Sequence, residues 1–171
     1  GSKVVQRLAI KERDGELCEE LANVPKRVAS SCNRHDMPLS SGFLTSADLD
    51  DQEDLRLLGA EAIEQGRQRR PEAIATLRSF LHEQGLLPPP EEPVKDVVFV
   101  AAMLQHLGRA DSRIVLATLE DLWGEDRPQN VPGTVHQRPN WRRRCRHSLE
   151  QIAELPAVQT AFDALRTARA R

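Results

Sequence analysis

The chain has 171 residues, of which 39% are hydrophobic and 29% are charged, a composition typical of a folded domain and not of a disordered one. Its formal net charge of -2 lacks the excess of Lys and Arg that nucleic-acid binding requires, so we expect no nucleic-acid partner. The longest apolar run, Val97–Leu104, is far shorter than the ~20 residues that cross a bilayer. No signal peptide is recognisable either, and we expect a cytoplasmic protein without membrane contact.

The cysteines are odd in number and far apart: Cys18, Cys32 and Cys145. None has a second Cys or a His at ligand spacing, so we predict reduced thiols, no metal and no cofactor. Gly1 and Ser2 resemble the remnant of a cleaved tag, and no Met precedes Lys3. We therefore expect the natural chain to extend upstream, and we leave residues 1–24 without an assigned role.

The first half of the chain gives four structural expectations. Charged and apolar residues alternate irregularly over Lys3–Glu20, which predicts a helix interrupted near Gly15. The segment Lys26–Cys32 predicts a buried strand, and Pro38 and Gly42 mark a loop after it. An antiparallel pair of helices should follow. Their apolar positions are Leu49, Leu55, Leu58, Ala62 and Ile63 before Pro71, and Ile74, Leu77, Phe80 and Leu81 after it.

The second half predicts further helices and one more strand. Val94–Leu107 is an apolar helix, and Ile114–Thr118 is a buried parallel strand that leads at once into a helical turn. An irregular stretch follows up to Asn140, and two helices close the chain at Ser148–Leu155 and Ala157–Ala170. The fold class is thus mainly α with little sheet, with two candidate strands and about five or six helices. Since a complete (β/α)8 barrel needs eight strands, the chain is either helical in its own right or one segment of such a barrel.

Two segments carry residues suited to chemistry. Asn33–Gly42 places His35 and Asp36 just after a buried strand, where barrel enzymes keep catalytic side chains. On these residues alone, a turn in which Asp36 accepts backbone N–H groups ranks above catalysis. Gln129–Arg144 supplies amide, hydroxyl and aromatic groups of the kind that bind sugars, namely Asn130, Thr134, Asn140 and Trp141. A turn-rich loop docked by its Trp explains that segment equally well.

A basic cluster in the same segment favours a solvated face over a binding site. It comprises Arg138, Arg142, Arg143, Arg144 and Arg146, flanked by His136 and His147. Only one aromatic residue lies within it, so pairing with nearby carboxylates is the better interpretation.

Three motifs in order resemble the C-terminal portion of the 4-alpha-glucanotransferases of glycoside hydrolase family 77. They are HDMPLSSGF (His35–Phe43), IVLATLEDLWG (Ile114–Gly124) and QNVPGTVHQRPNWRRR (Gln129–Arg144). The last is the most specific, and the resemblance covers most of the chain from about Val28 onward. It implies that residues 25–171 are the C-terminal portion of a (β/α)8 TIM-barrel enzyme acting on α-1,4-glucans and maltooligosaccharides.

The resemblance also implies a mechanism, which is retaining double displacement through a glycosyl-enzyme. The family uses a third carboxylate, preceded by His, to stabilise the transition state; by motif match this is Asp36, with His35 binding a hydroxyl. Asn130 and Pro132 match the loop that borders the same sugar pocket. The family's nucleophile and acid/base lie upstream of anything present here, so the chain alone should be inactive.

The chain departs from the family pattern at Arg34 and Leu39, where Thr is usual before the His-Asp pair and common after the Pro. An alternative is therefore a non-catalytic helical module that binds glucan or a protein partner. An excised barrel segment would also leave strand edges and helix faces uncovered. The sequence therefore predicts self-association of the chain.

Overall fold

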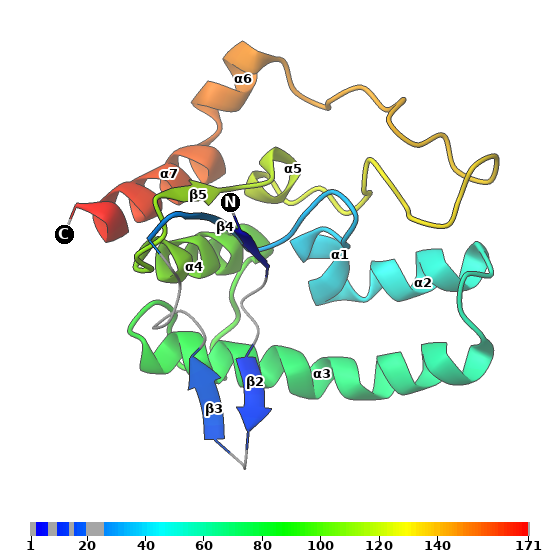
Figure 1. Ribbon diagram of the computed structural model, residues 1–171, viewed down its shortest axis with the longest axis horizontal. Helices are drawn as coiled ribbons and strands as arrows, with labels where there is room; N and C mark the ends of the chain where they lie inside the picture. The colour runs from blue at the N-terminus through cyan, green and yellow to red at the C-terminus, as the bar shows by residue number, and fades with distance from the viewer. Residues whose placement is uncertain (1–2, 7–9, 14–15, 20–25, 171) are drawn as a thin grey trace.

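A small parallel sheet lies at the centre of the molecule. The computed structural model describes residues 3–6, 10–13, 16–19 and 26–170. Strands β1 (Lys3–Gln6), β4 (Val28–Ser31) and β5 (Ile114–Leu116) pair in the order β1-β4-β5, all parallel, with Ser30 opposite Val115. Figure 1 shows helices arranged around this sheet. The predicted strands in Lys26–Cys32 and Ile114–Thr118 are both confirmed.

The prediction of a helix over Lys3–Glu20 is wrong. Besides β1, this segment forms an antiparallel hairpin of β2 (Ile10–Arg13) and β3 (Glu16–Glu19). The two strands are separated by Asp14 and Gly15, the pair of residues that most favours a two-residue hairpin connection. Pairing with a second strand therefore overrides the local helical pattern, and the Asp-Gly pair is the signal that could have predicted it.

The hydrophobic core is built on two packed helices, α4 (Asp96–Gly108) and α7 (Pro156–Arg169). Both match predicted helices. Every side chain of α4 from Phe99 to Leu104 is buried, as its continuous apolar sequence requires. The helices approach so closely at Gly108 that a Cβ there would lie 2.9 Å from the Cβ of Ala168. The other buried members of the core are Phe80, Leu81, Leu87, Leu122, Ile152, Val158 and Ala161.

Helices α2 (Ala47–Asp54) and α3 (Ala60–Glu83) form an antiparallel pair, as predicted (Figure 1). The predicted position of the break between the two helices is wrong. We expected it at Pro71, which instead lies inside α3. A proline inside a helix costs about 3 kcal/mol. Part of this cost is offset next to it, where the Arg70 guanidinium binds both carboxylate oxygens of Asp48, at 2.8 and 2.9 Å.

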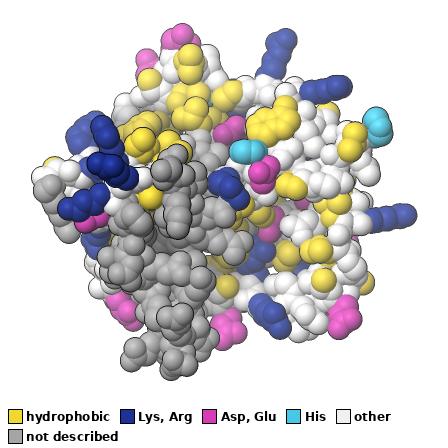
Figure 2. All heavy atoms as spheres, viewed as in Figure 1, with side chains coloured by type: hydrophobic (Ala, Val, Ile, Leu, Met, Phe, Trp, Pro, Cys, Tyr) yellow, Lys and Arg dark blue, Asp and Glu magenta, His cyan; other side chains and the backbone are white. Residues whose placement is uncertain are grey.

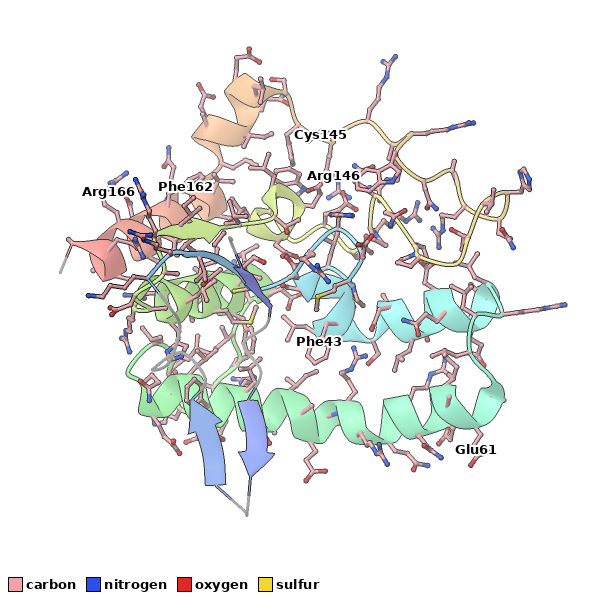
Figure 3. All side chains as sticks on the ribbon, in the orientation of Figure 1. Phe43, Glu61, Cys145, Arg146, Phe162 and Arg166 are labelled. Carbon is pink, nitrogen blue, oxygen red and sulfur yellow. The ribbon has the colours of Figure 1, made fainter. Side chains whose placement is uncertain are left out.

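Arg70 also connects α3 to the short helix α1 (Ser40–Thr45). Its guanidinium donates to the carbonyl of Phe43 at 2.6 Å and lies 4.1 Å from the centroid of the Phe43 ring. Figure 3 shows Phe43 between α1 and α3. We expected a loop at Pro38 and Gly42, so α1 is a correction: its N-terminal residues are buried, and a buried segment satisfies its backbone polar groups by becoming helical.

The remaining elements follow the predicted order. Helix α5 (Leu119–Leu122) is the helical turn after β5, and α6 (Leu149–Glu154) precedes α7. The described residues form seven helices and five short strands, so the fold is mainly α with little sheet, as predicted. The described residues 123–148 contain no helix or strand, which agrees with the predicted irregular stretch up to Asn140.

The expected burial of β5 is wrong. Ile114 and Leu116 are 51% and 50% exposed, and β5 is an edge of its sheet. The face opposite α7 is uncovered in the described chain, so apolar side chains that suit a buried strand point to solvent. In the view of Figure 2, basic side chains gather over the end of α7, and positive and negative side chains are mixed over the rest of the visible surface. An uncovered edge of this kind fits self-association, which stays a prediction.

The buried His106 is expected to make the stability of the chain depend on pH. It is 1% exposed, and its ring meets that of Phe80 edge-on at 4.8 Å. Burial, with Arg109 nearby, lowers the pKa of His106 to about 4, whereas an unfolded His has a pKa of about 6.5. Between these values the unfolded state binds more protons, so the free energy of unfolding should fall as pH drops from about 6.5 to 4. Urea unfolding at several pH values should show a steeper slope in the wild type than in His106→Leu, because Asp and Glu contribute to both; equal slopes would contradict the assignment.

Candidate functional site

The turn that carries His35 and Asp36 is fixed by a buried carboxylate on another element. Asp121 in α5 is 3% exposed; it accepts from the side-chain amide of Asn33 at 2.5 Å and from the backbone N–H of Ser40 at 2.7 Å. Burial raises the pKa of Asp121, and these hydrogen bonds oppose the shift. One carboxylate thus holds both ends of the 33–40 turn, at the exit of β4 and at the start of α1.

Thr118 completes this network by donating to Oδ1 of Asn33 at 2.5 Å. The sequence interpretation did not find Asp121 or Asn33. The sequence offered little signal for Asp121, because α5 reads LEDL and its other acidic residue, Glu120, is not buried. Asp121 is buried because the donors of Asn33 and Ser40, from a distant part of the sequence, reach it.

Asp36 and Asn130 meet although they lie 94 residues apart in sequence. Nδ2 of Asn130 donates to Oδ1 of Asp36 at 2.9 Å, and Nε2 of His35 lies 3.2 Å from the same oxygen. The side chains of His35 and Asp36 are 59% and 45% exposed. Asp36 therefore has a side-chain amide partner from the second candidate segment. The alternative prediction was that the Asp36 carboxylate accepts backbone N–H groups of its own turn. Among the described residues, no backbone N–H donates to this carboxylate.

A pocket of about 400 Å³ opens between the turn, α2 and the loop after α5. Such a volume falls within the range that binds small molecules. Asp36, Asn130 and Pro132 all line it, and His35 stands beside it. Its other walls combine carboxylate and apolar side chains: Met37, Pro38, Leu39, Asp48, Asp51, Leu57, Leu58, Asp126 and Val131.

Two of the carboxylates at the pocket are neutralised by arginines. Asp48 is paired with Arg70, and Asp51 forms an ion pair with Arg138 of the loop. The Asp51–Arg138 contact joins the loop to α2, which Figure 1 shows lying between α3 and the loop. The remaining lining groups are amides, carboxylates and apolar surfaces, which suit a neutral, hydroxyl-rich ligand.

The polar residues of the 124–147 loop have divided roles. Asn140 accepts from the backbone N–H of Val131 at 3.2 Å and donates to Oγ1 of Thr134 at 2.9 Å. Asn140 and Thr134 thus hold the loop together instead of lining the pocket. Trp141, by contrast, is 60% exposed, with its ring centroid 5.2 Å from that of His35.

Pairing with carboxylates explains much of the basic cluster. Glu125 is almost fully buried and lies 3.2 Å from Arg143 and 3.7 Å from Arg146. Figure 3 shows Arg146 on the segment that leads to α6. Together with the Arg138–Asp51 pair, these contacts favour the structural interpretation of the cluster over phosphate binding.

Within the described residues, no helix is long and apolar enough to span a membrane. In the same part of the chain, no three His, Cys, Asp or Glu side chains are placed to hold a metal ion.

The family model of the glycoside hydrolase family 77 4-alpha-glucanotransferases matches residues 1–150. The chain belongs to this family. A 4-alpha-glucanotransferase of Mycobacterium tuberculosis is 38% identical over 116 residues, which cover 66% of this chain and 15% of that protein. The Haemophilus influenzae 4-alpha-glucanotransferase is 26% identical over 158 residues, covering 88% and 22% respectively.

The fold of this family 77 chain also matches part of a solved TIM-barrel enzyme. The crystal structure of amylomaltase from Corynebacterium glutamicum aligns with a TM-score of 0.69 at 17% identity, over 81% of this chain and 22% of that one. At this identity the match concerns the fold alone. The chain spans 15% to 22% of the length of these relatives.

Proposed function

We propose that this chain forms one wall of the glucose site of a 4-alpha-glucanotransferase that transfers α-1,4-glucan segments between maltooligosaccharides. The observation that carries the proposal is the meeting of Asp36 and Asn130 at 2.9 Å, on the edge of a pocket of about 400 Å³. Membership of family 77 supports the reaction type. The proposal also takes the chain to be the C-terminal portion of a longer barrel protein.

In the proposed reaction, a carboxylate on polypeptide beyond this chain attacks the anomeric carbon, and the glycosidic bond to the departing sugar breaks. A second carboxyl group outside this chain gives its proton to the departing 4-oxygen. The 4-hydroxyl of another glucan then attacks the glycosyl-enzyme and returns a proton to that group. The transferred sugar carries positive charge in both transition states, and the carboxylate of Asp36 stabilises it.

The neighbouring residues would orient the sugar. His35 and Asn130 each contact Asp36 and remain close enough to the pocket to bind sugar hydroxyls. Pro132 lines the pocket as a rigid wall, because its ring fixes the backbone angle. These contacts support positioning of one glucose unit against Asp36.

The chain alone should not catalyse transfer. Asp48 and Asp51 are bound by arginines, and we assign neither to the role of nucleophile or acid/base. Incubation of the purified chain with maltotriose should therefore yield no glucose or longer oligomers by chromatography, whereas the longer protein should produce both. Disproportionation by the purified 171-residue chain would contradict the proposed division of the site.

The alternative is a non-catalytic module that binds glucan or a protein partner, and it is supported by Arg34 and Leu39. Leu39 lines the pocket where the family often has Thr, which removes a hydroxyl from its wall. If the longer protein binds maltoheptaose in isothermal titration but never transfers it, this alternative replaces ours.

We also propose a cytoplasmic location, supported by cysteines that lack disulfide or metal spacing.

A further inference from the structure

We propose that Trp141 forms a second glucose-binding position, on which the sugar next to the one at Asp36 stacks. The proposal rests on the proposed function, since it needs a glucan at Asp36. Trp141 is 60% exposed, among the most exposed of the large apolar side chains in the described residues. An indole offers a flat apolar face, which suits the face of a pyranose ring.

The position of the indole relates it to the pocket. Its ring centroid is 5.2 Å from that of His35 at an interplanar angle of 58°, and Nε2 of His35 is 3.2 Å from Asp36. Trp141 does not line the pocket itself, so one imidazole separates the two. A glucan leaving the pocket on this side would pass His35 and reach the indole next.

The backbone holds Trp141 in a conformation that its side chain disfavours. Its φ is +61°, in the left-handed region where a bulky aromatic residue is an outlier. The loop imposes this conformation, because the N–H of Trp141 donates to the carbonyl of Gln129 at 2.9 Å and the preceding Asn140 is bonded to Thr134. The backbone of Trp141 is strained, its loop is held by hydrogen bonds, and its side chain is exposed near the pocket. This combination favours a binding role for Trp141 over a packing role.

The surroundings indicate the class of ligand. On the pocket side, the indole contacts the imidazole of His35, and His35 in turn lies beside the carboxylate of Asp36, to which the amide of Asn130 donates. The carboxylate disfavours an anionic ligand, and the amide and imidazole provide directional hydrogen bonds to hydroxyls. The hydrogen bonds that hold the loop together also limit the freedom that it loses on binding. A neutral sugar longer than one unit fits these features.

Binding of glucose and of maltoheptaose by the purified chain tests the proposal in isothermal titration. Trp141→Ala should weaken maltoheptaose binding about tenfold and leave glucose binding unchanged, because glucose occupies only the Asp36 position. Trp141→Tyr, which keeps a flat ring, should recover most of the affinity. Phe162→Ala is a matched control, since Phe162 is 46% exposed on α7, away from the pocket. It should bind both sugars as the wild type does.

Trp141→Gly separates binding from folding. Glycine adopts a positive φ freely, so this variant should melt at the wild-type temperature or above while binding maltoheptaose as weakly as Trp141→Ala. If Trp141→Ala binds maltoheptaose as tightly as the wild type does, the second position is wrong, whereas the proposed function depends on the transfer rate of Asp36→Asn in the longer protein. If Trp141→Ala weakens both sugars equally, its role is structural and the inference fails. If the wild-type chain binds neither sugar, it does not form the second position by itself and the inference fails.

Discussion

Replacing Asp36 with Asn should lower the rate of glucan transfer by a factor of about 10² to 10³ in the longer protein that, by our proposal, contains this chain. The substitution keeps the shape of the side chain and its Oδ1, so Asn130 can still donate to it. It removes the negative charge, which is needed chiefly when the sugar becomes positive. An interaction made mainly in the transition state is lost from kcat, with little change in KM.

The measurement is the initial rate of maltotriose disproportionation over a range of substrate concentrations, together with the melting temperature. Asp111→Asn is a matched control, because Asp111 is an exposed carboxylate outside the pocket. It should leave both kinetic constants and the melting temperature unchanged. Wild-type turnover in Asp36→Asn would remove this carboxylate from the reaction.

Replacing Asp121 with Ala should destabilise the chain by about 2 to 4 kcal/mol, since it strands buried donors that have no other described acceptor. The amide of Asn33 and the N–H of Ser40 both depend on this carboxylate. The turn between them carries Asp36, so the loss should loosen the site as well as the fold. In the longer protein we therefore expect transfer to fall too, although Asp121 itself is buried away from any sugar.

Urea unfolding of the purified chain measures the effect. Asp163→Ala is the comparison, because Asp163 is 65% exposed and forms only a surface ion pair with Arg166. Such pairs contribute at most about 1 kcal/mol. If the two variants unfold at similar urea concentrations, Asp121 does not organise the turn.

Much of the second half of the fold follows from local sequence. The apolar run of α4, the β-branched start of β5 and the Pro at the start of α7 each predict their element within a few residues. The errors lie where distant contacts decide. Pro71 lies inside α3, where the neighbouring Arg70 binds Asp48 and Phe43 across the helix pair and so stabilises the packing of this helix. No window of sequence around Pro71 contains those partners.

The candidate site, like the fold, could be predicted only in part from the sequence. The motif resemblance selected His35, Asp36, Asn130 and Pro132, and the structure brings them to one place. Spacing could not predict this, because the two segments are about ninety residues apart and meet only through the fold. The same holds for Thr134 and Asn140, whose residue types suit a sugar site but whose hydrogen bonds hold the loop together. Residue type alone does not distinguish a ligand-binding amide from a structural one.

The most direct test of the charge at position 36 compares two ligands of the longer protein. 1-Deoxynojirimycin carries a positive charge in a glucose-like ring and so mimics the transition state, whereas maltose is neutral. Asp36→Asn should bind the cationic mimic about 100-fold more weakly than the wild type, and maltose within about threefold of it. Equal affinity of wild type and Asp36→Asn for the cation would contradict the account.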